Sequence, residues 1–528
     1  MKFIARFLYV PLAGLLVLTS CAKDETESYD KFENQALEAW MTQHRSDLVE
    51  NLQSEGLYYV DLLDAGDLAS DPINTEDIWV SFDFSGRDLS GNIILTRNAD
   101  DAVLAGSFSK YTHYVPFYRY CGSENSGLME GTWLAMRRTL TLGDTYFRNN
   151  KDRLGITSPE VTLRYGSKIR LYMPSSVVGN GVEGTGGYEG QEGYSLSSKR
   201  PFIVTMEIRD TVSNPLEREG TDVDDFCELN GGLQIYSKGD DDTPATEVPE
   251  DPEDPEHPYN ETSKRWVSAC DSIPQVYVNV RYNPAEPRDQ LSFPAPYHVG
   301  YEPYVSEASV TDIDMQIAEA LKKRFHGEGD DYQKYEGVKA LEADSVTLDG
   351  TAKIWYIGRF LDGFIFDTNI DEVKQIIYGE VRKTGSAHSY DVQNPDLITA
   401  FYYIVPHLKY GQWATLVTTS TNAYGTTGKS GGSSTSTSSN GYTSSYYDYL
   451  NYLNYSQMYY GNNGYYGGYY NDYYGYGGLG NYGYYGGYYG GYGGNYDSGE
   501  TTTTTKVYTD IPSFSPLIFQ IYIEPDGK

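Results

Sequence analysis

The stretch GRFLDGFIFDTN, residues 358–369, joins an ordinary turn to an unusual junction of aromatic and acidic residues. Its Leu-Asp-Gly sequence predicts a tight turn, because aspartate and glycine tolerate the backbone conformations that such turns require. After the turn, Phe364, Ile365 and Phe366 run directly into Asp367. A carboxylate beside buried aromatic side chains must accept a hydrogen bond, face water or act on a bound molecule, because an unpaired buried charge is costly.

Two later segments extend the pattern around this stretch. AKIWYIGRFLDGFIFDTN (352–369) has a tyrosine, a glycine two residues on, an Asp-Gly turn and then Phe-Asp. It is followed by LITAFYYIVPHLKYGQWATLVTTSTNAYG (397–425) and IPSFSPLIFQIYIE (511–524). In this order the segments resemble the strand–turn–strand signature, the pocket-floor helix with its next strand, and the closing strand of FKBP-type peptidyl-prolyl cis-trans isomerases. The resemblance covers most of residues 350–524 apart from insertions.

Resemblance to this family implies a reaction that needs no nucleophile, metal or cofactor. Rotation about a peptide bond is opposed by a resonance barrier of ~18–20 kcal/mol, and proline does not remove that barrier. An apolar pocket that strips water from the amide favours the twisted state, in which resonance is lost. The expected partners are therefore proline-containing polypeptides, bound at Xaa-Pro bonds.

The resemblance also implies roles for individual residues. Asp367 would point towards the substrate amide, and Tyr424 would donate a hydrogen bond to the substrate carbonyl. Ile398 would offer its backbone N–H to the peptide. The residues implied to line the pocket are Tyr356, Phe366, Leu397, Ile398, Phe401, Tyr424 and Phe519.

Three features depart from the family pattern. Phe401 stands where the family usually has a tryptophan. Extra residues after Asp367 move the position expected to be aromatic on the intervening strand to His388, with Tyr390 two residues on. The loop that overhangs the pocket in the family here contains a tract, residues 441–496, that holds 22 of the 53 tyrosines together with glycine, asparagine and serine. Such a composition predicts a flexible insertion that could grip a client.

The first half of the chain resembles a degenerate copy of the same pattern. VSFDFSGRDLSGNIILTRN (80–98) keeps two glycines but has Ile94–Leu95 where the later segment has Phe366–Asp367. YGSKIRLYMPSSVVGNG (165–181) has Val178–Gly179 in place of Tyr424–Gly425, and RPFIVTMEIRD (200–210) would be the closing strand. Without the acid and the tyrosine, this copy is expected to be inactive and to serve as scaffold or client-binding surface.

The N-terminus predicts export. MKFIARFLYVPLAGLLVLTSC has two cationic residues, then an apolar run too short to span a bilayer, then small residues before Cys21. Its Leu-Thr-Ser-Cys ending resembles the lipobox of bacterial lipoproteins, in which the cysteine is lipidated. The acidic run after Cys21 is similar to the acidic patch that follows the cysteine in Bacteroidetes-type lipoproteins. This implies a protein of the cell envelope, lipid-anchored to the outer membrane on its periplasmic face or at the cell surface.

Charge and cysteine content exclude several classes of function. The net charge of −34 argues against nucleic acid and against an anionic membrane surface as partners. The histidines and cysteines are scattered and form no HExxH or CxxC pattern, so no metal site is expected. An oxidising envelope would permit one disulfide, for which Cys227 and Cys270 are the candidates.

The expected fold class is α+β, with two FKBP-like domains, each a twisted antiparallel β-sheet wrapped around a short α-helix. An amphipathic pattern predicts a helix over 31–54, and a Pro- and acid-rich stretch (238–264) predicts an extended linker. The expected units are a signal peptide (1–21), a tether with the N-terminal helix (22–55), a degenerate domain (56–212), an acidic Pro-rich linker (213–272), and an isomerase domain (273–528) with a Tyr/Gly-rich insertion (426–507).

Two functional hypotheses follow from these patterns. The first is a membrane-anchored envelope peptidyl-prolyl isomerase or folding chaperone whose second domain is catalytic. The alternative is a non-catalytic FKBP-like surface binding or adhesion lipoprotein that uses the Tyr/Gly-rich tract.

Overall fold

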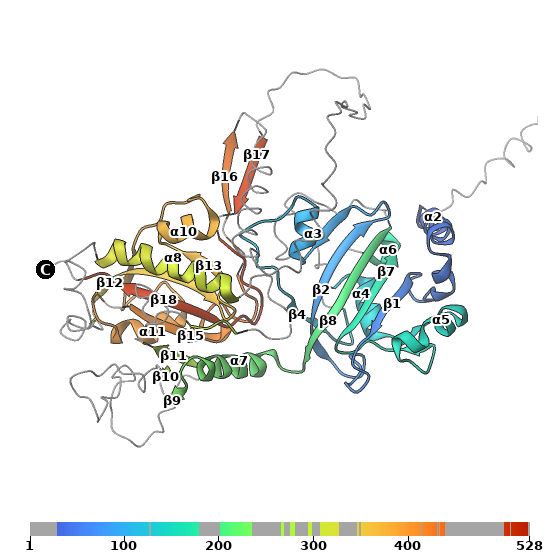
Figure 1. The fold of residues 1–528 in the computed structure, drawn as a ribbon, viewed down its shortest axis with the longest axis horizontal. Coiled ribbons are helices and arrows are strands. Elements are labelled where there is room, and N and C mark those ends of the chain that lie inside the picture. Colours follow the sequence, from blue (N-terminus) through green and yellow to red (C-terminus); the bar gives the residue numbers. More distant parts are fainter. Residues whose placement is uncertain are drawn as a thin grey trace, which may run out of the picture.

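The computed structural model forms two lobes, shown in Figure 1, with the first domain on the right and the second on the left. Cys21, the predicted signal and tether before residue 29, residues 235–265 and residues 439–500 of the Tyr/Gly-rich insertion lie outside the described residues. The structure describes residues 29–125, 128–178, 201–234, 266–268, 275–279, 294–297, 307–326, 346–347, 350–411, 413–429, 431, 433–438, 501–506 and 508–525.

The first domain is built on a six-stranded antiparallel sheet. Its strands lie in the order β1, β7, β8, β2, β3, and β4 pairs with the first half of β2. Val80, Phe82 and Phe84 of β2 are buried, because alternate residues of a strand point to the same face. The strands are β1 Tyr59–Ala65, β2 Ile78–Asp88, β3 Ile93–Thr96, β4 Phe117–Cys121, β7 Ser167–Met173 and β8 Phe202–Val212, with the small pair β5 Leu140–Thr141 and β6 Glu160–Val161.

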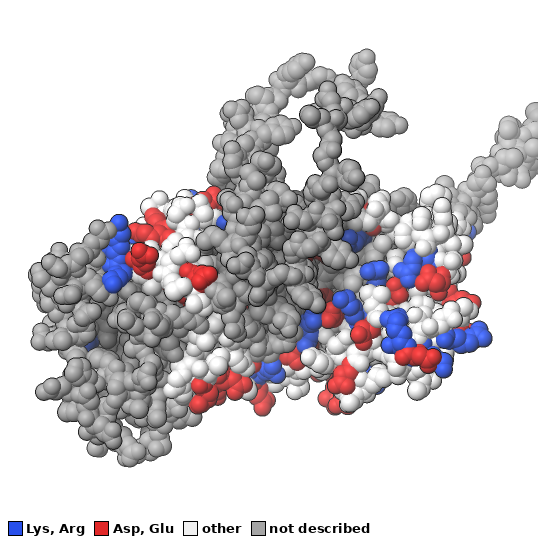
Figure 2. Space-filling model, viewed as in Figure 1, with Lys and Arg blue, Asp and Glu red and all other residues white. Residues whose placement is uncertain are grey.

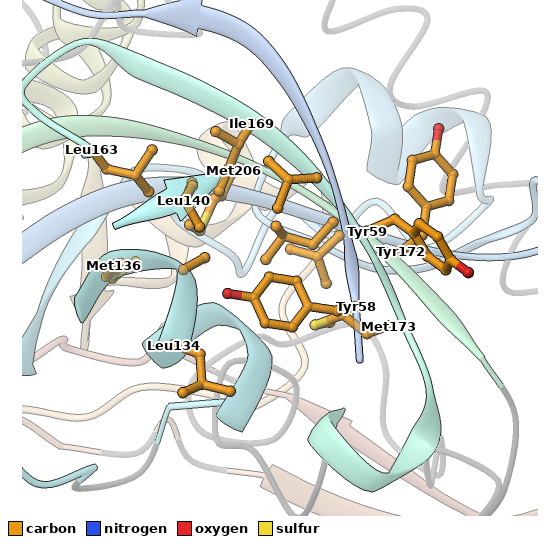
Figure 3. Packing of buried hydrophobic residues seen from close by; sticks show 14 of the residues in the cluster. Tyr58, Tyr59, Leu134, Met136, Leu140, Leu163, Ile169, Tyr172, Met173 and Met206 are labelled. Atoms are coloured by element: carbon orange, nitrogen blue, oxygen red, sulfur yellow. The ribbon is translucent and has the colours of Figure 1, made fainter. Parts of the chain in front are cut away.

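Helices close one face of this sheet over a large apolar core. Figure 3 shows the ring of Tyr58 between helix α4 and the sheet. Leu134 and Met136 of α4 belong to the same buried cluster as the sheet residues Ile169 and Met206. The helices of this domain are α2 Tyr29–His44, α3 Ala99–Leu104, α4 Glu130–Arg137, α5 Asp144–Leu154 and α6 Ser175–Val178.

The helix predicted over 31–54 is shorter than expected. The α-helix α2 ends at His44, and Ser46–Asn51 continue as the 3-10 helix η1. Arg45 breaks the helix with a φ of −140°, and its guanidinium donates to Asp47, Asp61 and the Tyr172 hydroxyl. Tertiary contacts of Arg45 therefore override the helical periodicity.

The second domain contains an eight-stranded sheet in the order β13, β12, β18, β15, β11, β10, β9, with β14 paired to β12. All of its pairs are antiparallel except β9–β10 at the edge. The strands are β9 Leu233–Gln234, β10 Trp266–Ser268, β11 Val276–Asn279, β12 Thr351–Phe360, β13 Ile365–Thr368, β14 His388–Asp391, β15 Trp413–Thr418 and β18 Leu517–Ile523; the helices are α8 Glu307–His326, α10 Asp371–Tyr378 and α11 Thr399–Ile404.

The two sheets have the same strand order. The series β3-β2-β8-β7-β1 of the first domain corresponds to β13-β12-β18-β15-β11 of the second, and β4 and β14 pair with β2 and β12 respectively. A short helix follows β4 and β14 in each domain, α4 and α11. This confirms the predicted fold class: α+β, with two domains, each an antiparallel sheet packed on a short helix.

Part of the segment expected to be a linker is folded onto the second domain. Helix α7, Pro215–Leu229, begins two residues after β8 and lies along the lower edge of the second domain in Figure 1. Its apolar face joins a cluster with Trp266 and with Val417 and Ile518 of the second sheet. Cys227 is a buried free thiol in this cluster. Cys270, its expected disulfide partner, lies outside the described residues.

A loop of the first domain also packs against the second. Tyr111 stacks on Tyr378 with ring centroids 4.0 Å apart, and Lys110 donates to the Tyr378 carbonyl. Between the lobes a two-stranded ribbon projects outward, formed by β16 Ser433–Ser438 and β17 Thr501–Lys506 (Figure 1).

The visible surface of the first domain carries mixed charge. Figure 2 shows acidic and basic side chains interspersed on this face. Several form ion pairs, among them Arg209 of β8 with Asp83 on the neighbouring strand β2 and with Glu207 on the same strand. Among the described residues, no helix combines the length and apolar character needed to cross a membrane.

Candidate functional site

The β12–β13 hairpin positions the aromatic–acid junction. A register shift after Gly358 sets Gly358 opposite Asp367 and Arg359 opposite Ile365. A Cβ on Gly358 would lie 2.6 Å from the ring of Phe366, so only glycine lets this ring lie across the strand. Phe366 is thereby held in the core, while Asp367 is partly exposed beside it.

Tyr356 provides the polar partner of Asp367. Tyr356 and Gly358 lie on the same face of β12, because side chains alternate along a strand. The Tyr356 hydroxyl donates to Asp367 Oδ2 at 2.7 Å. The carboxylate that the sequence left unexplained thus accepts a hydrogen bond from within the site.

The implied apolar residues come together around this pair. Phe519 on β18 lies at the centre, with ring centroids 5.6 Å from Phe366, 5.2 Å from Phe401 of α11 and 6.3 Å from Tyr356. Two of these contacts are edge-to-face, a geometry that aromatic quadrupoles favour. Phe366, Phe401 and Phe519 are buried in one cluster, against which Tyr356, Leu397, Ile398 and Tyr424 pack partly exposed.

Tyr424 is held by a compact turn after β15. The carbonyl of Ser420 accepts the N–H groups of Ala423 and Gly425 at 2.9 and 2.7 Å, on both sides of Tyr424. Gly425 has a φ of +72°, a left-handed conformation that glycine adopts without strain. Ile398 is the N-cap of α11, and no acceptor for its N–H lies among the described residues. These eight residues, Tyr356, Phe366, Asp367, Leu397, Ile398, Phe401, Tyr424 and Phe519, are called the candidate site below.

Burial controls the titration of the polar groups in the candidate site. It raises the pKa of Asp367, while the hydrogen bond from Tyr356 and the charge of Lys429 act in the opposite direction. Burial, followed by the nearby Asp367 carboxylate, raises the pKa of Tyr356 and of Tyr424. Both tyrosines are therefore neutral donors at physiological pH.

Sequence reasoning missed one charged residue at the site. The Lys429 ammonium lies 4.6 Å from the ring centroid of Tyr424 and 5.9 Å from that of Tyr508. Lys429 and Ile511 exchange two backbone hydrogen bonds that fix this position. No motif marks a lysine in a glycine-rich loop, so only the structure could find it.

His388 and Tyr390, the residues expected on the strand between Asp367 and Leu397, both lie on strand β14, but their surroundings differ. His388 and Tyr390 lie on β14 opposite Ile354 and Ala352. Tyr390 is fully buried in the core of the second domain, whereas His388 is partly exposed and bonds Asp396 at 2.9 Å. Tyr390 is therefore a core residue.

The first domain repeats the hairpin without its polar groups. Gly86 lies opposite Leu95, with a register shift after Gly86, as Gly358 lies opposite Asp367 in the second domain. Phe84, two residues before Gly86, takes the position of Tyr356 and lacks its hydroxyl. Both Phe84 and Leu95 are 1% exposed. Because the first domain lacks both the hydroxyl of Tyr356 and the carboxylate of Asp367, its junction is fully apolar. That Phe84 corresponds to Tyr356 follows only from the strand register.

Other residues of the copy have also changed. Val204 on β8 lies opposite Gly86, where Phe519 lies opposite Gly358. Val178 ends helix α6 and is buried in the first core, and Gly179 lies outside the described residues.

Comparison with known proteins gives structural matches only. No family model and no curated protein matches the chain. Similar solved structures include the three FKBP domains of wheat FKBP73, at 9% identity and a TM-score of 0.18, covering 89% of this chain and 95% of that one. A peptidyl-prolyl cis-trans isomerase of Pseudomonas syringae pv. tomato matches at 16% identity and 0.20, covering 35% and 96%, and FkpA of Escherichia coli at 10% and 0.21, covering 40% and 72%.

Proposed function

We propose that the second domain binds proline-containing polypeptides at the candidate site and catalyses cis–trans isomerisation of Xaa-Pro bonds. The observation that carries this proposal is the Tyr356–Asp367 hydrogen bond at the partly exposed edge of an aromatic cluster. A carboxylate partly removed from water costs free energy unless it is well paired, and the first domain folds around the same hairpin without one. A role towards a bound molecule explains why the acid is present.

The chemistry needs only this chain's own side chains. The rings of Phe366, Phe401 and Phe519 would take up the proline ring and exclude water from the amide. A desolvated amide loses less resonance energy on twisting, because water no longer stabilises its planar, more polar form. Tyr424 would donate to the substrate carbonyl, and the Ile398 N–H would hold the peptide backbone.

The rest of the chain would support this activity. The first domain, whose hairpin lacks both polar groups, would act as a non-catalytic scaffold or client-binding surface. Lipidation at Cys21 would anchor the protein to the outer membrane, on its periplasmic face or at the cell surface. A protein placed there would act as a folding catalyst or chaperone for envelope polypeptides.

A protease-coupled assay on a short proline peptide, with the mature full-length chain, tests the catalytic proposal. The double variant Asp367→Asn, Tyr424→Phe should reduce kcat/KM by about 10²-fold or more, because it removes a positioned charge and a donor. Tyr165→Phe, which removes the hydroxyl of an exposed tyrosine of the first domain, is the control and should leave kcat/KM unchanged. Equal activity of wild type and double variant would falsify catalysis at this site.

Peptide binding separates the proposal from its non-catalytic alternative. The NMR signals of Tyr356, Phe366 and Tyr424 should shift when a proline peptide is added. Shifts without turnover would identify a binding or adhesion protein. Deleting residues 439–500 should then abolish partner binding for an adhesin but preserve turnover for an isomerase.

A further inference from the structure

Helix α7 connects the first domain to the turn that carries Tyr424. It begins at Pro215, after only Ser213 and Asn214 separate it from the central strand β8 of the first sheet. Its far side packs on the second sheet. The helix thus contacts both domains.

Glu219 is the residue of α7 that reaches the turn. It is 2% exposed, and its carboxylate accepts both the backbone N–H and the hydroxyl of Ser420, the latter at 2.8 Å. The carbonyl of the same Ser420 accepts the N–H groups of Ala423 and Gly425. The buried Glu219 carboxylate therefore fixes Ser420, and the Ser420 carbonyl in turn holds the backbone on both sides of Tyr424.

The contact between α7 and the turn is close along its length. The side chain of Gln275 occupies the space where a Cβ of Gly220 would lie, and the Gln275 carbonyl accepts the N–H of Thr419. A Cβ at position 220 would displace the amide end of the Gln275 side chain. Helix α7 therefore packs closely against the residue that precedes β11 and whose carbonyl accepts the Thr419 N–H.

The neighbouring residue of α7 is tied to the first domain. Arg218 pairs with Asp222 at 3.0 Å and lies 3.8 Å from Asp210 of β8. Asp210 in turn accepts a hydrogen bond from Tyr118 on β4. Consecutive residues of one helix thus contact the first sheet and the Tyr424 turn of the second domain.

We infer that Glu219 is a positioning residue for Tyr424 and that α7 thereby makes the candidate site depend on the first domain. The effect of Glu219 on isomerase activity rests on the proposed function, whereas its effect on the position of Tyr424 does not. It assigns a role to a helix that the sequence placed in a linker. It also explains why an inactive copy of the domain is joined to the active one by two residues and a helix.

The test uses the mature full-length chain and two readouts, hydrogen exchange of residues 420–425 and kcat/KM on a proline peptide. Glu219→Ala should speed exchange of this turn roughly tenfold and lower kcat/KM roughly tenfold, since small misplacement of a positioned group is costly. Glu219→Gln keeps the volume and one acceptor for the Ser420 N–H, so it should recover part of both losses. Glu217→Gln, an exposed residue of the same helix, is the control and should change neither.

The readouts separate this inference from the proposed function. If wild type shows no isomerase activity, the proposed function fails, and hydrogen exchange still decides whether Glu219 holds the turn. Unchanged exchange in folded Glu219→Gln and Glu219→Ala would overturn the inference. So would faster exchange of the turn with unchanged kcat/KM in an active enzyme.

Discussion

His113 of the first domain bonds Asp362 of the second, with Nε2 and Oδ2 2.6 Å apart and both side chains almost fully buried. Asp362 belongs to the Asp-Gly turn of the β12–β13 hairpin and also accepts the N–H of Phe364. The imidazole ring stacks on Phe360 at 4.4 Å and contacts Phe364 at 4.5 Å. The turn that the sequence explains as ordinary is therefore also a joint between the two domains.

Removing this joint should destabilise the protein. His113→Ala deletes a buried ring and a hydrogen-bond partner of Asp362, so the expected loss is about 2–4 kcal/mol in the free energy of unfolding. Urea unfolding of the full chain measures it. His388→Ala, which breaks a half-exposed pair with Asp396, is the control and should cost less than about 1 kcal/mol. Similar costs for the two variants would show that the joint does not stabilise the chain.

Replacing Tyr356 and Asp367 of the second domain with the apolar residues found in the first should abolish activity without lowering stability. The double variant Tyr356→Phe, Asp367→Leu reproduces Phe84 and Leu95, and it removes donor and acceptor together. Its stability should lie within about 1 kcal/mol of wild type or above it, because no buried polar group is left unpaired. Its isomerase activity should be lost. A large loss of stability would instead make the Tyr356–Asp367 pair a structural element.

The single variant Asp367→Leu provides the comparison. It leaves the Tyr356 hydroxyl without the acceptor it uses in the native site, which costs about 1–3 kcal/mol. A double-mutant cycle from urea midpoints should therefore show Tyr356→Phe relieving this cost. Additive single effects would mean that the two side chains do not interact in solution.

The pH dependence of activity should follow Asp367. Burial raises its pKa, so protonation begins at a higher pH than for an exposed aspartate. As pH falls through that range, the carboxylate is lost and kcat/KM should fall. In Lys429→Gln the fall should begin at a higher pH, because the lysine charge favours the ionised form. A profile that Lys429→Gln does not move would show that the two groups do not interact.

Glu219 should make the free energy of unfolding fall as pH rises, whereas Asp367 makes activity fall as pH falls. Burial raises the pKa of Glu219 from 4.5 to about 7. The hydrogen bonds from Ser420, which is uncharged and faces Glu219, lower this pKa, and the charge of Asp222 on the same helix raises it. Between these values the folded state binds more protons than the unfolded state, so stability falls as pH rises. Urea unfolding at pH 5 and pH 8 should show Glu219→Gln losing about 2–3 kcal/mol less across this interval than wild type. Equal changes in the two proteins would contradict this coupling.

Local sequence was sufficient for the parts of the site that lie within single segments. The alternation of β12, the glycine two residues after Tyr356 and the Phe366–Asp367 junction are consecutive features, and the hairpin brings them together over a short loop. The same holds for the copy, where Gly86 and Leu95 have the register of Gly358 and Asp367. Strand periodicity and turn chemistry act over a few residues, which is why they can be read from the chain.

The tertiary structure decided the contacts made over long separations. The sequence predicted the two antiparallel sheets and, through the family resemblance, the aromatic cluster and the absence of the acid from the first hairpin. It did not reveal that α7 belongs to the second domain, that Glu219 holds the turn of Tyr424, or that His113 meets Asp362 249 residues away. These contacts depend on how two folded domains pack, and a buried glutamate or histidine has no periodicity by which its distant partner could be predicted.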